Sequence, residues 1–300
     1  MILHIPHSST KIPDGVKFDK SIEEDLLRMT DWYTDELFSY SSMETIVFPW
    51  SRLFCDVERF IDDEPMEQQG HGICYTRDSF GGQLRNVTDE ERQDIIEKYY
   101  KPHHTKFSIA CNHCLSLFKE IVIVDCHSFS NEALPHEPDQ DVIRPDFCIG
   151  IDEFHTPQIL VDEIKNYLES KGYVVFINKP FAGTIVPLVH YKKNKDLKSI
   201  MIEVNRKLYF GKSDEEFQYI KGIIGEVLNI VDTYEGSPAI GMICKKSSLP
   251  IYWVECPYFK AYSHRNILLT NLLSFRLQDY QTALVTLKSV FFVFESGLSS

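Results

Sequence analysis

The stretch that most constrains this sequence is Ile121–Ser128, which reads IVIVDCHS. Four β-branched residues in a row are typical of a buried strand in a parallel sheet. The run then ends in polar residues that include Asp125 and His127. Because ligands of open α/β sheets bind outside the carboxyl ends of the strands, this pattern predicts a functional site where the strand ends.

Two other stretches have the same form. Residues 1–9, MILHIPHSS, run from apolar residues to His7, and residues 199–206, SIMIEVNR, place Glu203 inside an apolar run. The carboxyl ends of parallel strands meet at one edge of a sheet. We therefore expect His7, His127 and Glu203 to lie together there and to form an active site.

The remaining pattern alternates strands with helices. The chain has 300 residues, of which 43% are hydrophobic and 25% charged, as in an ordinary globular protein. Such alternation predicts an α/β fold with a mostly parallel sheet. We expect strands at 1–6, 45–48, 121–126, 147–151, 173–178 and 199–204, and helices at 21–39, 88–119, 156–171 and 215–232.

Local signals refine these elements. Ser21 with Glu24, and Thr88 with Glu91, have the spacing of capping boxes at helix starts. Pro102 is expected to kink or divide the second helix. Residues 62–83 are charged, rich in glycine and without periodicity, which predicts a long loop over the site.

The carboxyl-terminal part of the sequence predicts few structural features. We expect residues 1–232 to form the domain that carries the site and residues 233–300 to form an extension packed on it. Residues 267–293 are apolar and typical of a helix, followed by a strand-like VFFVF run at 290–294. No function is assigned to this extension.

The composition excludes several classes of protein. A net charge of −13 argues against a nucleic-acid binder, which needs a basic face. No apolar run reaches the ~18 residues of a membrane span, and no signal peptide is expected because His4 and His7 interrupt the start. The eight cysteines are scattered rather than arranged in a disulfide pattern, which favours a cytoplasmic protein with free thiols.

A metal site is the simplest use of two histidines in equivalent positions. Catalytic metal sites often take two histidines and a carboxylate and leave one position open for water. His7 and His127 supply the nitrogen ligands in this interpretation. The carboxylate is open between Asp31 and Asp35, which share a helix face at i, i+4 spacing, with Glu58 as a weaker candidate.

Glu203 is the candidate general base. A carboxylate in an apolar strand costs free energy unless it is paired or functional. It would either pair with an arginine or take a proton from a metal-bound water. Arginines suit the binding of an anionic substrate because they hold carboxylates with two hydrogen bonds. The candidate substrate-binding residues are Arg59, Arg77, Arg85, Arg206 and Ser128.

Eight motifs together resemble the N-formylglutamate amidohydrolase family in order and approximate spacing. They are HIPHSS (4–9), TDWYTDELF (30–38), SRLFCDVERF (51–60), GICYTRDSFGGQLR (72–85), VDCHSF (124–129), DFCIGID (146–152), GYVVFINKPFAGTIVP (172–187) and SIMIEVNRKLY (199–209). The resemblance covers about residues 1–230 and is specific as a set.

The resemblance implies a hydrolase that cleaves N-formyl-L-glutamate to formate and glutamate in histidine breakdown. It also implies a three-layer α/β/α fold with a mostly parallel mixed sheet, like that of the zinc carboxypeptidases, and one Zn²⁺ ion. In those relatives zinc is held by an HxxE motif and a later histidine. Position 10 is threonine here, so the carboxylate ligand comes from elsewhere, and Asp31 is expected rather than Asp35.

By the same resemblance His7 and His127 hold zinc, Glu203 is the base, and Arg59 binds a carboxylate of a small anionic N-acyl amino acid. Two alternatives stay open. One is an amidase or carboxypeptidase of the same fold that acts on another N-acyl amino acid or peptide. The other is a non-catalytic binding protein that has kept the fold. The oligomeric state is not predicted.

Overall fold

The sequence folds around a six-stranded sheet, in a computed structural model that describes residues 1–40, 44–62, 64–137 and 139–234. The strands are β1 (Ile2–Ile5), β2 (Glu44–Val47), β3 (Ile121–Phe129), β4 (Phe147–Gly150), β5 (Val175–Ile177) and β6 (Leu197–Asn205). Their order is β2-β1-β3-β6-β4-β5, and neighbours pair in parallel except β4 with β6. The predicted α/β fold with a mixed, mostly parallel sheet is confirmed.

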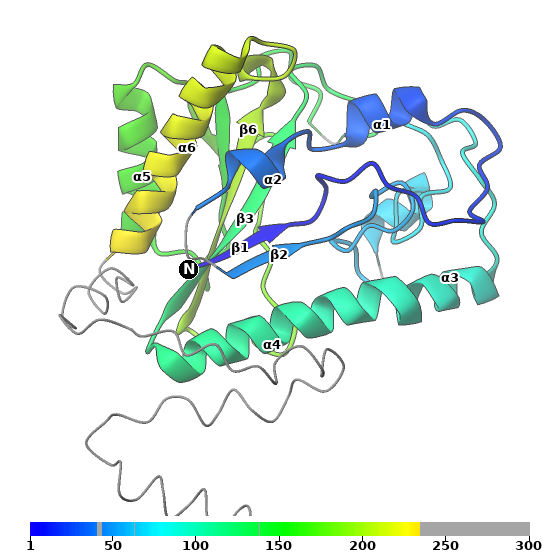
Figure 1. The fold of residues 1–300 in the computed structure, drawn as a ribbon, viewed down its shortest axis with the longest axis horizontal. Helices are drawn as coiled ribbons and strands as arrows, with labels where there is room; N and C mark the ends of the chain where they lie inside the picture. Colours follow the sequence, from blue (N-terminus) through cyan, green and yellow to red (C-terminus); the bar gives the residue numbers. More distant parts are fainter. Residues whose placement is uncertain (41–43, 63, 138, 235–300) are drawn as a thin grey trace, which may run out of the picture. The chain divides into compact units, whose positions relative to one another are not determined.

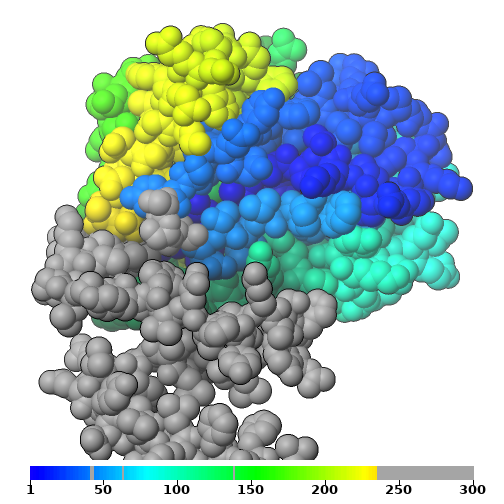
Figure 2. Space-filling view, in the orientation of Figure 1, coloured from blue at the N-terminus to red at the C-terminus, as the bar shows by residue number. Residues whose placement is uncertain are grey.

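Helices cover both faces of this sheet (Figure 1). On one face lie α5 (Gln158–Ser170) and α6 (Asp214–Thr233), together with the short α2 (Thr34–Leu37). The other face packs against α4 (Lys101–Leu117). Figure 2 shows the amino-terminal segment, in blue, at the surface between the yellow α6 and the teal segment that contains α4.

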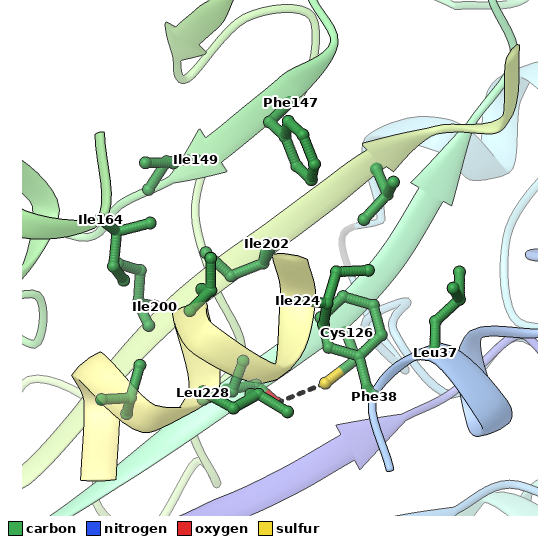
Figure 3. Packing of buried hydrophobic residues seen from close by; sticks show 14 of the residues in the cluster. Leu37, Phe38, Cys126, Phe147, Ile149, Ile164, Ile200, Ile202, Ile224 and Leu228 are labelled. Carbon is green, nitrogen blue, oxygen red and sulfur yellow. Dashed lines mark hydrogen bonds between the residues drawn. The ribbon is translucent and has the colours of Figure 1, made fainter. Parts of the chain in front are cut away.

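The alternation of side chains along the strands decides which residues face which layer. Val122, Val124 and Cys126 of β3 point to the core beneath α5 and α6, where Ile200 and Ile202 of β6 join them (Figure 3). Ile121 and Ile123 belong to the core on the α4 side. The residues that continue this second face toward the carboxyl ends of β3 and β6 are polar, and they form the site described below.

The predicted helix over residues 21–39 is two short helices. The first, α1 (Glu23–Met29), begins after Ile22 without a side-chain cap, so the expected capping box of Ser21 with Glu24 does not form. The chain then leaves the helix at Thr30 and passes a left-handed residue, Tyr33, before α2 begins. Tertiary contacts override the helical pattern here.

Those contacts come from the carboxyl end of β6 and the 3₁₀ turn η3 (Arg206–Leu208) that follows it. The Arg206 guanidinium donates to the carbonyls of Arg28 and Thr30, each at 2.7 Å. The hydroxyl of Tyr209 donates to the Trp32 carbonyl at 2.8 Å. The break therefore has a fixed shape, and it places Asp31 outside any helix.

The second predicted helix is continuous but irregular. It begins as α3 (Asp89–Ile95) with the predicted capping box of Thr88 and Glu91, which is confirmed. A π-helical turn, η2 (Ile96–Tyr100), joins α3 to α4. Pro102 lacks an N–H for the carbonyl four residues before it, and the wider π turn accommodates this loss without dividing the helix.

The other predicted elements lie within a few residues of the observed ones. The predicted loop at 62–83 is mostly irregular in its described residues, apart from the 3₁₀ turn η1 (Pro65–Gln69) and two isolated bridges. β3 continues to Phe129, three residues beyond the strand end predicted at 126. The predictions for residues 235–300, including the helix and strand near the end, lie outside the described residues.

A pair of Ile→Val substitutions tests the packing of α6. Ile224 is fully buried on the sheet, whereas Ile109 of α4 is 60% exposed. We expect Ile224→Val to lower the free energy of unfolding by about 1 kcal/mol, because a buried methyl group is lost. Ile109→Val changes helix propensity in the same way but is expected to stay within ~0.5 kcal/mol of the parent. Urea unfolding measures both, and equal effects would contradict the assigned packing.

Candidate active site

A cavity of about 490 Å³ opens at the carboxyl ends of the central strands. Residues from β3, β6 and the segments after β1, α1 and β2 line it, so parts of the chain far apart in sequence converge there. Its lining includes the predicted site residues His7, Asp31, Arg59, His127, Ser128, Glu203 and Arg206, together with Glu58. The structure thus brings His7, His127 and Glu203 to one sheet edge, as the sequence predicts.

Strand register accounts for part of this arrangement. His127 of β3 is the register partner of Glu203 in β6, and His4 of β1 is the partner of Asp125. Because alternate residues share a face, Asp125 and His127 lie on the same side of β3. The register of three parallel strands thus fixes four polar side chains on one small area of the sheet.

One group of side chains can hold a metal ion. One ligand atom from each of His7, Glu58 and His127 lies within 4.8 Å of the others. Nε2 of His127 is 3.1 Å from Oε2 of Glu58, and Nδ1 of His7 is 3.8 Å from that oxygen. The His7 side chain is buried, yet its Nδ1 has no hydrogen-bond partner among the described residues.

This donor set fits a divalent cation. Two imidazole nitrogens and a carboxylate oxygen are ligands that zinc takes in catalytic sites, and an unpartnered buried nitrogen is costly without a ligand. Burial alone would lower the pKa of His127, but the carboxylates of Glu58 and Asp125 raise it well above the usual value. The local excess of negative charge that favours a proton on His127 favours a metal cation equally.

The outer nitrogen of each histidine meets a carboxylate. Nε2 of His7 lies 2.9 Å from Oδ1 of Asp56, and Nδ1 of His127 lies 3.0 Å from Oδ2 of Asp31. Metal-binding histidines usually donate their other N–H to such a group, which fixes the tautomer and the ring orientation. Burial would raise the pKa of Asp31, but the interactions with His127 and His7 lower it.

The geometry bears on the open choice of carboxylate ligand. Glu58 approaches both histidines from the side of their inward nitrogens. Asp31 contacts the outer nitrogen of His127 and lies 3.7 Å from Nδ1 of His7, so it reaches only one inward nitrogen. Asp35 is exposed on α2. This arrangement favours Glu58 as the ligand and Asp31 as the group that orients His127.

A second group, made of His4, Glu58 and Asp125, overlaps the first. Nδ1 of His4 donates to Oδ1 of Asp125 at 3.0 Å, and His4 is completely buried. Oδ2 of Asp125 accepts the backbone N–H of Ile185 at 3.1 Å. Asp125 therefore connects β1 with the segment that forms another wall of the cavity.

Glu203 is the one carboxylate of this cluster with an unpartnered buried oxygen, Oε2, among the described residues. Burial raises its pKa to about 8, with opposition from His127 and further repulsion from Asp31 and Glu58. A cation among these carboxylates would lower that pKa. In its ionised form the side chain can accept a proton inside the cavity, because its Oε2 is not occupied by another residue of the described chain.

The predicted arginines separate into two groups. Arg59 and Arg206 line the cavity. Arg77 is exposed and donates to the Gly81 carbonyl, and Arg85 is buried and donates to the carbonyls of Tyr75 and Phe54. Neither Arg77 nor Arg85 belongs to the cavity lining, so the structure does not bring them to the site.

Ser128 is buried and borders the cavity. It lies two residues after Cys126 in β3, so its side chain is on the face covered by α5 and α6, beside the Tyr209 hydroxyl. Three other buried atoms of the cavity lining have no partner among the described residues: Nδ1 of His7, Oε2 of Glu203 and Nδ1 of His136. Such atoms favour a polar ligand there.

Two candidate functional residues, Arg52 and Asp56, were not predicted from the sequence. Arg52 lines the cavity, and Asp56 orients His7. Oδ2 of Asp56 accepts from Arg52 at 3.1 Å and from the Tyr75 hydroxyl at 2.8 Å. The signal available was the density of charged residues in SRLFCDVER (51–59), which alternate with apolar ones in a segment that is neither strand nor helix.

No helix within the described ranges is long and apolar enough to cross a membrane. The described cysteines are all free thiols.

Comparisons with known proteins identify relatives of this chain. A family model described as N-formylglutamate amidohydrolase matches residues 1–210. The N-formylglutamate deformylase of Pseudomonas putida is 22% identical over 229 residues, which are 73% of this chain and 84% of that protein. The N-formylglutamate deformylase of Pseudomonas aeruginosa is 20% identical over 219 residues, 70% of this chain and 81% of the relative.

Solved structures show the same fold. The crystal structure of N-formylglutamate amidohydrolase from Ralstonia eutropha JMP134 superposes with a TM-score of 0.68 at 23% identity, covering 77% of this chain and 92% of that one. The gene product Atu2144 from Agrobacterium tumefaciens gives a TM-score of 0.56 at 16% identity, covering 77% and 91%.

Proposed function

Because the chain belongs to the N-formylglutamate amidohydrolase family, we propose that it hydrolyses the N-formyl amide of N-formyl-L-glutamate to formate and glutamate. The sequence prediction of an amide hydrolase agrees with this family. The observation that carries the proposal is the convergence of the His7–Glu58–His127 group with the free Oε2 of Glu203 in one cavity.

His7 Nδ1, Glu58 and His127 Nε2 would hold one zinc ion. When bound, zinc supplies Lewis acidity, which polarises a carbonyl and makes a water molecule more acidic. The remaining chemistry belongs to side chains of this chain. Asp56 and Asp31 keep the outer N–H of His7 and His127 occupied, so that each ring presents a lone pair to the cavity.

Glu203 moves the protons. Its Oε2 accepts a proton from the water that attacks the formyl carbon, and it later gives that proton to the leaving nitrogen. The C–N bond breaks, and formate and the free amino group of glutamate are formed. Ser128 borders the cavity but shares the face of Cys126 on β3, which packs toward α5 and α6, so it has no part in the chemistry of this proposal.

Arg52 and Arg59 would bind the carboxylates of the substrate. In Arg52, Nε donates to the Tyr75 hydroxyl and Nη2 donates to the Asp56 carboxylate. In Arg59, Nε donates to the His71 carbonyl and Nη1 donates to the Glu58 carbonyl. Nη1 of Arg52 and Nη2 of Arg59 hydrogen-bond to no residue in the described part of the chain, although Nη2 of Arg59 lies 3.6 Å from Asp56. Both side chains line the cavity and are held in place by their other nitrogens.

Arg206 has a different part in this proposal. Both its terminal nitrogens donate to backbone carbonyls at the break between α1 and α2, which carries Asp31. We therefore assign it to the support of Asp31 and His127 in the first place. It still lines the cavity, and its remaining N–H groups can contact an anionic substrate.

The proposal extends to zinc as the metal, to histidine breakdown as the process, and to the cytoplasm as the location. Zinc is supported by the two nitrogens and one oxygen of the ligand group. The free thiols of the described cysteines support a reducing compartment. The role in histidine breakdown follows from the family resemblance.

Formate release tests the proposal. Purified protein with N-formyl-L-glutamate is expected to release formate, and prior treatment with a strong chelator followed by gel filtration is expected to abolish release until zinc is restored. Release that survives metal removal would contradict the metal-dependent reaction. If folded, zinc-loaded protein releases no formate, the substrate is another N-acyl amino acid or peptide.

A neutral analogue tests the arginine assignment. We expect kcat/KM for N-formyl-L-glutamate to exceed that for N-formyl-L-glutamine by about 10- to 100-fold, because a charged hydrogen bond to a half-buried guanidinium is lost. The two substrates differ only in the side-chain carboxylate. Equal values would mean that no arginine of the cavity recognises that group.

A further inference from the structure

Glu58 lies in a segment without regular secondary structure. Residues 56–59 come after β2 and form turns and a bend, so no strand ladder or helix fixes their backbone. This segment nevertheless supplies Asp56, which orients His7, and Glu58, which faces both histidines. It also supplies Arg59 to the cavity. Three site functions therefore depend on the shape of four residues.

Two side chains from the π-helical turn and the start of α4 hold this segment. The Tyr100 hydroxyl donates to the Arg59 carbonyl at 2.7 Å, and Nε2 of His104 donates to the Val57 carbonyl at 2.8 Å. A carbonyl oxygen can only accept, so both side chains are donors. The two bonds lie on either side of Glu58 along the backbone.

Tyr100 ends the π turn, and His104 lies in the first turn of α4. Tyr100 and His104 are four residues apart, which puts them on one helix face, and their ring centroids are 4.2 Å apart. The extra residue of the π turn rotates everything after it by about 100° relative to a regular α-helix. π turns of this kind often occur at functional sites.

We propose that Tyr100 and His104 are positioning residues that hold the Val57–Arg59 backbone and thereby aim Glu58 at the metal. This inference rests on the proposed function, because it takes Glu58 as a metal ligand. Asp56 assists from within the segment, since its Oδ1 accepts the N–H of Glu58 at 3.0 Å. The Arg59 guanidinium donates a hydrogen bond to the Glu58 carbonyl at 3.2 Å.

Tyr100→Phe tests the proposal because it removes one hydroxyl and leaves the ring. We expect the zinc affinity of the metal-free protein, measured by competition with a chromophoric chelator, to fall by about 10-fold, the lower end of the range for direct partners of metal ligands, because Tyr100 holds the backbone next to Glu58 rather than Glu58 itself. Tyr100 and His104 also border the cavity, and a titration without substrate separates metal positioning from substrate contact.

Tyr99→Phe is the matched control. Tyr99 is the preceding residue, packs on Trp50 and Phe54, and its hydroxyl has no hydrogen bond to a described residue. The same hydroxyl is therefore removed one position away, without touching the Val57–Arg59 backbone. We expect this variant to bind zinc as wild type does.

His104 gives a second, independent variant pair. His104→Gln keeps an N–H donor of similar reach for the Val57 carbonyl, whereas His104→Leu removes it. We expect zinc affinity to fall in the leucine variant and to be largely restored in the glutamine variant. Urea unfolding of the metal-free proteins accompanies each titration, so that a general loss of stability is separated from a loss of metal affinity.

The outcomes distinguish failure of the positioning role from failure of the proposed function. If wild type binds zinc and Glu58→Gln weakens binding, but Tyr100→Phe behaves like Tyr99→Phe and both His104 variants bind zinc as wild type does, the positioning role is wrong and the proposed function stands. If Glu58→Gln leaves zinc binding unchanged, the ligand assignment fails, and with it this inference.

Discussion

Replacing Glu203 with glutamine is expected to lower kcat for formate release by about a thousandfold while leaving the zinc content unchanged. Glutamine has nearly the same shape but cannot accept the proton of the attacking water, and proton transfer by a positioned side chain contributes ~10²–10⁴-fold in enzymes. Glu203 faces the cavity with a free Oε2 and is not a member of the group that can hold the metal. KM should change little because the substrate carboxylates are bound elsewhere.

Glu36→Gln is the matched control for this result. Glu36 lies exposed on α2, so its replacement makes the same chemical change at the surface. Steady-state kinetics and metal analysis on the same preparations show whether Glu203 acts as the base or as a metal ligand. If Glu203→Gln loses zinc, Glu203 is a ligand rather than a base. If it retains wild-type kcat, the proton is carried by another group.

Glu58→Gln is expected to abolish stoichiometric zinc binding, and activity with it. Glu58 is the carboxylate shared by both metal-competent groups, and its Oε2 lies close to the inward nitrogens of both histidines. Removing its charge leaves two neutral nitrogens, which bind a divalent cation weakly. The loss should exceed the ~10–100-fold expected when an outer partner of a ligand is removed.

Asp31→Asn and Asp35→Asn complete this comparison. An asparagine side chain at position 31 could still contact the outer nitrogen of His127 but without charge, so zinc affinity should fall by about 10- to 100-fold. Asp35 is exposed, and its variant should bind zinc like the parent. Zinc titration of the metal-free proteins ranks the three positions. Complete loss of zinc in Asp31→Asn with retention in Glu58→Gln would restore Asp31 as the ligand.

The motifs in the sequence resemble those of the N-formylglutamate amidohydrolase family, and the family model confirms this resemblance. A set of short motifs in a fixed order is more specific than any one of them. The resemblance shows common descent, but it does not show in which direction a given side chain points in the folded chain.

The sequence by itself determined the elements whose signals are local. The apolar runs around Ile123 and Ile202 specify two buried strands, since side-chain alternation and β-branching are properties of the strand alone. The Thr88–Glu91 capping box specified a helix start because both partners lie within one turn. His7, His127 and Glu203 were found for the same reason: each is attached to such a strand, and parallel strands end at one edge.

Only the tertiary structure decided which carboxylate and which arginines face the cavity. Asp31 lies in a break that Arg206 holds from 176 residues away, where the sequence pattern predicted one helix. Glu58 and Arg59 lie in an irregular segment held by a helix more than forty residues further along the chain. Arg85 looks like a loop arginine in the sequence, yet it donates to two backbone carbonyls outside the site.

The physical reason is the range of the interactions. Helix caps and strand alternation act over a few residues, so a sequence window contains both partners. The direction of a side chain on an irregular segment depends on hydrogen bonds to distant residues, such as the bond of His7 to Asp56 across 49 positions. The strands were therefore predictable from the sequence, whereas the ligand set and the arginine assignments required the folded chain.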